Sequence, residues 1–120
     1  MKYMLLIYVN PATLQSFSEE EMNEIFRAHE EFQKVITESG EMVNTKALAD
    51  VSSTATVRVR DGATVVTDGP YLEAKEHFAG YYLVDCERRE RAIELAAMIP
   101  DAKFSAMEVR AVLDESGMEM

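Results

Sequence analysis

The sequence predicts a domain of the α+β class, in which two helices pack against one face of a β-sheet. Three features of the 120-residue chain lead to this prediction. An apolar run opens the chain, two later segments carry apolar residues at helical spacing, and short apolar or alternating segments separate and follow them. The length and the 48% share of hydrophobic residues are ordinary for one globular domain.

The first predicted element is a strand over residues 3–9. Apolar side chains stand there at consecutive positions, which is typical of a central strand covered on both faces. The run is short and is followed by Asn10-Pro11 rather than by a small-residue cleavage site, so we do not interpret it as a signal peptide. Because no other run approaches the ~20 apolar residues that cross a bilayer, we expect no membrane span.

A long helix is predicted to begin after Ser18. Ser18 and Glu21 have the spacing of a capping box, and the carboxylates of the first turn suit the positive end of the helix dipole. Gly40 is the expected end, because glycine adopts the left-handed cap conformation without a Cβ penalty. One face of this helix carries Met22, Ile25, Phe26, His29, Phe32 and Ile36.

The remaining elements are predicted from alternation, turn residues and a second helical segment. Asp61-Gly62 separates two short strands and supplies the positive φ angles of a tight hairpin turn. We expect residues 1–113 to form one domain and residues 114–120, which show no periodicity, to form a flexible tail. The predicted strands are 42–48, 56–60, 64–67, 78–84 and 104–113, and the second helix is 87–99, ending before Pro100.

The predicted order is therefore strand, helix, strand, hairpin, strand, helix, strand. Without the hairpin, this is the β-α-β-β-α-β arrangement of ferredoxin-like folds. Since two helices cover only one face of such a sheet, the apolar first strand needs a cover on its other face. A second copy of the sheet is the simplest cover, so we expect a homodimer with a pocket between the sheets or at their edges.

Composition excludes several classes of function. The chain has 12 basic and 22 acidic residues, a net charge of −10, which disfavours binding to nucleic acids and to anionic membranes. Its single cysteine, Cys86, forms no intrachain disulfide, and we expect a cytoplasmic location. One cysteine and two histidines do not build a zinc cluster, and no glycine-rich phosphate loop follows a strand. We therefore expect neither a metal nor another cofactor.

Several segments resemble the YCII-related proteins, and specifically their DGPF branch. The resemblance runs in collinear order through residues 1–8, 56–62, 66–71, 75–76, 80–83 and 107–110. The phenylalanine of the DGPF motif is Tyr71 here, a change that adds a hydroxyl group. The resemblance implies a dimeric ferredoxin-like α+β barrel. Some family members accompany or are fused to extracytoplasmic-function sigma factors, and a few YCII relatives are small-molecule lyases or dehalogenases.

Asp68-Gly69-Pro70-Tyr71 is the most distinctive segment of the chain. One interpretation is structural, because Asp, Gly and Pro all favour turns and Pro70 restrains Gly69. The other is functional: a stiff turn next to strands would hold the Asp68 carboxylate and the Tyr71 ring at the mouth of a pocket. Asp68 is thus a candidate catalytic residue and Tyr71 a candidate substrate-binding residue.

His29 is the second candidate catalytic residue. An imidazole titrates near neutral pH and serves as a general base or acid when a carboxylate orients it. It is alternatively a histidine at the edge of the core with no chemical role. YCII relatives carry a proposed catalytic histidine on the buried face of the first helix, with an acidic partner near the end of that helix. The resemblance implies the same role for His29, with Glu38 or Glu41 as its partner.

Two cations complete the candidate site. Lys75 lies in a charged segment with Glu73, Glu76 and His77 and is suited to anchor an anionic substrate, although such a run is by default a solvated loop. Arg110 shares a strand face with Glu108. Its guanidinium is suited either to bind a substrate carboxylate at the dimer pocket or to pair with Glu108 within the sheet.

Two functions remain open from the sequence. The first is a homodimeric small-molecule binder or cofactor-free enzyme that moves a proton with His29 and Asp68. The second is a non-catalytic regulatory module that contacts a sigma factor, with its acidic surface facing a basic partner.

Overall fold

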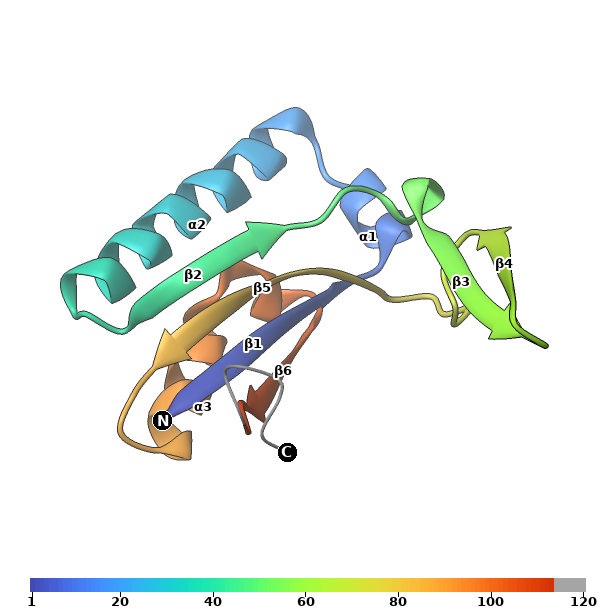
Figure 1. Ribbon diagram of the computed structural model, residues 1–120. Coiled ribbons are helices and arrows are strands. Elements are labelled where there is room, and N and C mark those ends of the chain that lie inside the picture. Colours follow the sequence, from blue (N-terminus) through green and yellow to red (C-terminus); the bar gives the residue numbers. More distant parts are fainter. Residues whose placement is uncertain (114–120) are drawn as a thin grey trace.

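The chain folds into a four-stranded antiparallel sheet with two long helices on one face, as the computed structural model of residues 1–113 shows (Figure 1). The strands stand in the order β2-β5-β1-β6, which is compatible with a ferredoxin-like fold. The predicted tail, residues 114–120, lies outside the described residues. The sheet consists of β1 (Lys2–Val9), β2 (Met42–Ala47), β5 (His77–Asp85) and β6 (Ala106–Ala111), and the helices are α2 (Glu19–Glu38) and α3 (Arg89–Met98).

Strand β1 lies in the middle of the sheet, between β5 and β6, which confirms the prediction of a central strand. Its side chains alternate between fully and partly buried positions. Leu5 and Ile7 face the helices and are buried, whereas Leu6 and Tyr8 point to the opposite face and are only partly covered. Within one chain, the helices therefore protect a single face of the sheet.

Helix α2 begins as its sequence predicts. The Ser18 hydroxyl accepts a hydrogen bond from the Glu21 amide, and the Glu21 carboxylate accepts one from the Ser18 amide, so the capping box is complete. The helix ends at Glu38, and Gly40 adopts a φ of +81° just beyond it. Phe32 and Ile36 are the residues of this helix that are buried in the core.

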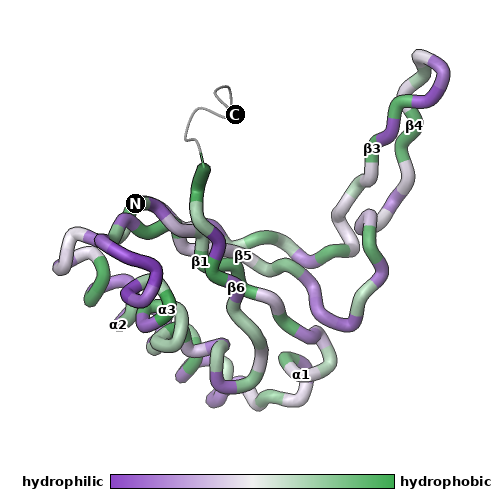
Figure 2. The backbone as a smooth tube through the Cα atoms, turned by 90° about the horizontal axis from the view of Figure 1, so that it is seen from below, coloured by the Kyte–Doolittle hydropathy of each residue, from purple (hydrophilic) through white to green (hydrophobic). Residues whose placement is uncertain are grey.

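The predicted hairpin is present but stands away from the main sheet. Strands β3 (Ala55–Arg60) and β4 (Ala63–Asp68) pair only with each other, and both Asp61 and Gly62 have positive φ in the turn between them. Figures 1 and 2 show this hairpin projecting from the body of the protein. Val57, Val59 and Val66 are each at least 60% exposed. Such an isolated two-stranded hairpin is marginally stable in water.

Short helical segments that the sequence did not predict join the main elements. Helix α1 (Pro11–Gln15) follows β1, with Asn10 accepting a hydrogen bond from the Ala12 amide and Pro11 in the first turn. One 3₁₀ turn covers Val51–Ser53, and a second covers Pro100–Lys103. The second turn matters most for the site. Pro100 does end the preceding helix, but it also begins a turn that buries the next residue, Asp101.

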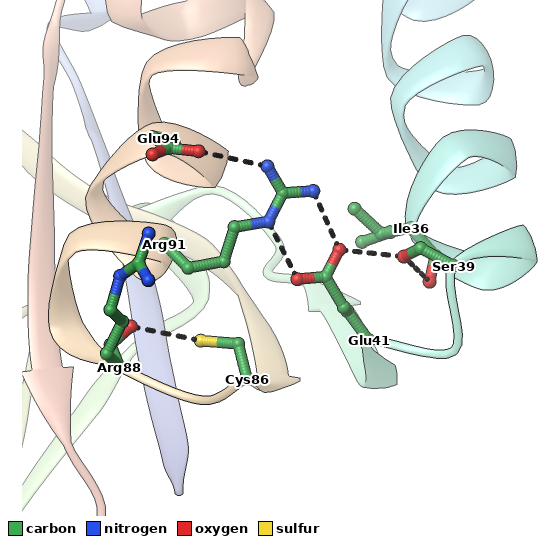
Figure 3. A network of polar contacts seen from close by, with 7 residues as sticks. All are labelled: Ile36, Ser39, Glu41, Cys86, Arg88, Arg91 and Glu94. Atoms are coloured by element: carbon green, nitrogen blue, oxygen red, sulfur yellow. Dashed lines mark hydrogen bonds and ion pairs between the residues drawn. The ribbon is translucent and has the colours of Figure 1, made fainter.

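A bidentate ion pair joins Glu41, the residue before β2, to Arg91 of α3 (Figure 3). Arg91 donates from Nε and Nη2 to the two carboxylate oxygens of Glu41, each at 2.9 Å, and from Nη1 to Glu94 at 3.1 Å. The hydrogen bonds from Arg91 hold the pKa of the Glu41 carboxyl below its ordinary value. Glu41 therefore lies beyond the C-terminal end of α2, where it binds Arg91, and it is not the partner of His29.

This ion pair predicts a pH-dependent contribution to stability. Because the pKa of Glu41 is lower in the folded protein, the stabilisation is present above the unfolded pKa and is lost as the pH falls through the folded value. Glu41→Gln should lower the free energy of unfolding by about 1 kcal/mol at neutral pH, since the Arg91 side chain is 35% exposed and partly screened. Urea denaturation at pH 7 and below about pH 4 measures this difference.

The matched control for this prediction is Glu94→Gln, which removes an exposed carboxylate with one hydrogen bond to the same arginine. It should change stability less than Glu41→Gln. If Glu41→Gln lowered the free energy of unfolding by the same amount at neutral and at acidic pH, the ion-pair explanation would be contradicted.

Candidate functional site

A cavity of about 480 Å³ lies beside α2 and the strand pair β2–β5. Part of its lining is apolar and comes from Ile7, Ala47, Ala79 and the half-exposed ring of Phe26. The polar lining residues come from α2, β2, β5 and the second 3₁₀ turn: His29, Glu30, Gln33, Thr45, Lys46, Tyr82 and Asp101. A second cavity, of about 390 Å³, lies beside Glu41 and Arg91, where these two charges already neutralise each other.

His29 stands at the centre of the polar groups. Its Nε2 lies 2.5 Å from Oδ1 of Asp101, and its Nδ1 lies 2.8 Å from the hydroxyl of Tyr82. An ionised carboxylate only accepts hydrogen bonds, so the hydrogen-bond network assigns the proton of the neutral imidazole to Nε2. Nδ1 then accepts the hydrogen bond that the Tyr82 hydroxyl donates.

Asp101 is the partner that orients His29. It is 7% exposed and is the one charged residue among positions 1–113 that is buried. A buried carboxylate is costly unless it is paired and hydrogen-bonded, and the imidazole of His29 provides this pairing. The backbone carbonyl of Asp101 closes the turn, because it accepts hydrogen bonds from the amides of Phe104 and Ser105. The carboxylate is thus held on a rigid segment.

Tyr82 and Gln33 complete the network on the other side of the ring. The side-chain amide of Gln33 donates to the Tyr82 hydroxyl at 3.1 Å. Tyr82 is 2% exposed, and Phe32 packs edge-on against its ring at 4.9 Å. Burial raises the pKa of the Tyr82 hydroxyl above its ordinary value. Among the described residues, no buried side-chain nitrogen or oxygen lacks a partner.

Of the five residues that the sequence proposed for the site, only His29 lines this cavity. Asp68 ends the projecting hairpin, and Tyr71 and Lys75 lie exposed in the segment that returns to β5. The guanidinium of Arg58 lies over the Tyr71 ring, 5.2 Å from its centre. The turn at Asp68 is therefore not the wall of the His29 cavity in one chain.

Arg110 lies on the opposite face of the sheet from the cavity. It is paired in register with Met4 of β1, whose side chain points away from the helices. Tyr8 and Glu108 share this open face, and the hydrogen bond with Glu108 raises the pKa of the Tyr8 hydroxyl. The expected partners of His29 were also wrong: Glu38 is exposed at the end of α2, Glu41 binds Arg91, and Asp101 takes their place.

Three residues of this network were not predicted from the sequence: Asp101 and Tyr82, which contact His29, and Gln33, which contacts Tyr82. Gln33 was detectable, because it stands four residues after His29 on the same face of a helix. Tyr82 adjoins Tyr81, and which of the two faces the helices depends on the strand register. Asp101 follows a helix-ending proline, and nothing in the local pattern indicates burial of its carboxylate.

Two further observations concern metal ligands and membrane spans in the described part of the chain. Residues 1–113 contain no group of three or more His, Cys, Asp or Glu side chains arranged to hold a metal ion. None of their helices combines the length and the apolar character that a membrane span requires. The His29 cluster itself is suited to acid–base chemistry, since a carboxylate orients an imidazole beside a cavity.

Comparison with known proteins agrees with the resemblance seen in the sequence. The family model of the YCII-related domain matches residues 1–116. An uncharacterized protein of Rhizobium meliloti (strain 1021) is 32% identical over 105 residues, which cover 88% of this chain and 85% of that protein. Since the family model spans nearly the whole sequence, the chain belongs to the YCII-related family.

Proposed function

We propose that this protein is a cofactor-free enzyme that moves a proton on a small molecule bound in the His29 cavity. The observation that carries this proposal is the contact between His29 Nε2 and the buried Asp101 carboxylate, at 2.5 Å, on the wall of the cavity. An aspartate that fixes the tautomer of a histidine and stabilises its protonated form is a recurring device of general-base catalysis.

The cavity indicates the class of substrate. Its volume of about 480 Å³ falls in the range of small-molecule sites. Apolar side chains line one part, and the acid–base groups gather on another. Among the charged side chains of the lining, that of Glu30 is exposed, whereas Lys46 is in register with Tyr81 and directs its side chain to the open face. A small, mainly apolar molecule with one acidic C–H or O–H group fits this arrangement.

A thermal-shift screen against a metabolite collection tests the proposal. A ligand that binds the folded state raises the melting temperature by mass action. We expect His29→Ala to reduce this shift and His77→Ala to preserve it, because His77 lies at the start of β5 and does not line the cavity. Ligands that stabilise the wild type and both variants equally would rule out the His29 cavity as their site.

We also propose that the active protein is a homodimer joined through the open face of the sheet. Met4, Leu6, Tyr8, Tyr81 and Leu83 are alternating residues of β1 and β5 on this face, and they are only partly covered in one chain. A two-fold axis would bury this surface against its own copy. Such a pairing would form the dimeric α+β barrel that the sequence resemblance implies.

The predicted site residues other than His29 would act only in the dimer. Arg110 would border the interface, where its guanidinium is suited to bind a substrate carboxylate. Three other candidates lie outside the cavity of their own chain: Asp68, Tyr71 and Lys75. A catalytic role for Asp68, and substrate binding by Tyr71 and Lys75, would therefore require a second copy of the chain that completes a site around them.

Sedimentation equilibrium checks the dimer. The wild type should have twice the 13.5 kDa mass of the chain at micromolar concentration. Leu6→Glu should shift the protein to the monomer, because it places a charge in the centre of the proposed interface. The matched control is Val57→Glu, on the hairpin, which should remain dimeric. A wild type that sediments as a 13.5 kDa particle would refute the dimer.

The projecting hairpin supports a second candidate function. Val57, Val59 and Val66 form an exposed apolar strip, which is typical of a protein-contact surface. In this alternative, the protein is a non-catalytic regulatory module that associates with an extracytoplasmic-function sigma factor. Co-purification with a sigma factor encoded beside it, lost in a Val57→Ser/Val66→Ser variant, would support this function. Absence of association at low and moderate salt would count against it.

A further inference from the structure

We infer that Tyr82 is a catalytic residue, and that its hydroxyl receives the proton of the substrate while it passes its own proton to His29. The inference rests on the proposed function and adds the atom that meets the substrate. Its starting point is that both nitrogens of His29 are already engaged, Nε2 by Asp101 and Nδ1 by Tyr82. The base has no free lone pair for a direct attack.

The hydrogen-bond capacity of the Tyr82 oxygen leaves one position open. A tyrosine hydroxyl donates one hydrogen bond and accepts up to two. Here it donates to His29 Nδ1 and accepts from the Gln33 amide at 3.1 Å. One acceptor position remains, and Tyr82 lines the cavity together with His29. A proton from a bound molecule can therefore enter the network through this oxygen without breaking any contact.

The transfer balances without any additional reagent. The substrate X–H bond breaks and its electron pair stays on X, while a new O–H bond forms at Tyr82. At the same time the original O–H bond of Tyr82 breaks and an N–H bond forms at Nδ1 of His29. The products are the substrate anion and an imidazolium whose charge is stabilised by the Asp101 carboxylate.

Burial of Tyr82 favours this concerted route over a free tyrosinate. Its hydroxyl keeps a raised pKa because it is removed from water, so it retains its proton near neutral pH. It accepts a second proton only as it gives up the first. The ring packs edge-on against Phe32 and its hydroxyl accepts a hydrogen bond from Gln33, and these contacts position the oxygen 2.8 Å from Nδ1.

The probe for the test is 5-nitrobenzisoxazole, a small neutral aromatic molecule that needs only a general base. Removal of its ring C–H proton forms a nitrile, breaks the N–O bond and releases a coloured phenolate. We expect His29→Ala and Tyr82→Phe each to lower the rate by about 10²-fold. The matched control is Tyr3→Phe, which removes the hydroxyl of another buried tyrosine that does not line the cavity and should keep the wild-type rate.

The solvent isotope effect of the wild type distinguishes a relay from a structural role of Tyr82. The C–H proton of the probe does not exchange with D2O, whereas the Tyr82 hydroxyl proton does. Proton passage through Tyr82 predicts a rate that is clearly slower in D2O, and direct attack by His29 predicts nearly equal rates. This measurement needs no variant, so it stands even if Tyr82→Phe fails to fold, which circular dichroism would reveal.

Three outcomes separate the hypotheses. Loss of rate in both His29→Ala and Tyr82→Phe, with a slower wild-type rate in D2O, supports the relay. Loss in His29→Ala alone, with equal rates in H2O and D2O, overturns the relay and leaves His29 as a direct base. A wild-type rate that His29→Ala does not change overturns both the relay and the proposed general-base function.

Discussion

Asp101→Asn is expected to slow proton abstraction from 5-nitrobenzisoxazole by about 10²–10⁴-fold, the range of a general acid–base contribution. The substitution keeps the shape of the side chain but removes the charge that would stabilise an imidazolium at His29 in the proposed mechanism. The side-chain amide of the new asparagine can also turn its N–H group toward Nε2 of His29. The imidazole proton would then move to Nδ1, which could no longer accept the hydrogen bond from the Tyr82 hydroxyl. The rate of phenolate release measures the effect.

The matched control for this prediction is Asp85→Asn. Asp85 is an exposed aspartate on β5 whose carboxylate contacts the N-terminal amine at the surface, so its loss should leave the rate unchanged. Thermal melting verifies that both variants are folded. An Asp101→Asn protein that is folded and retains the wild-type rate would show that the carboxylate has only a structural role.

Leu5→Ala is expected to lower the free energy of unfolding by about 2–5 kcal/mol. Leu5 is fully buried at the centre of β1, in the core that Ile36 of α2 and Leu95 of α3 also enter. The truncation removes apolar contacts and leaves a cavity that the surrounding strands close only in part. Urea denaturation followed by circular dichroism measures the change, with the slope of the transition expected to stay the same.

Leu6→Ala provides a comparison at the adjacent position. It is the same substitution on the open face of the same strand, where the side chain is only partly covered within one chain. It should lower the free energy of unfolding less than Leu5→Ala does, when the two are compared at concentrations too low for the proposed dimer to form. If the two variants were equally destabilised in the monomer, the assignment of core and open faces to β1 would be wrong.

Much of the fold was predictable because it depends on neighbouring residues. The capping box of Ser18 and Glu21, the turn at Asp61-Gly62 and the alternation in β3 each involve residues a few positions apart. The order of strands and helices followed from these local patterns, and the observed sheet order agrees with it. Helix α1 was missed because five residues are too few to show helical periodicity.

The candidate site was predictable only in part. The position of His29 on the buried face of α2 followed from helical spacing, and its chemistry followed from its residue type. The turn residues around Asp68 stood out in the sequence, yet in one chain they lie on the projecting hairpin and not in the cavity. Distinctive turn residues mark a required backbone shape, which does not place them near a histidine elsewhere in the chain.

The sequence by itself determined the class of the fold, the family and the histidine that is suited to acid–base chemistry. Only the tertiary structure decided which carboxylate meets that histidine. Asp101 lies 72 residues after His29, and the two come together because a 3₁₀ turn after α3 packs beside α2. Periodicity and capping report interactions within a few residues, whereas a contact between distant segments depends on how the sheet and both helices pack together.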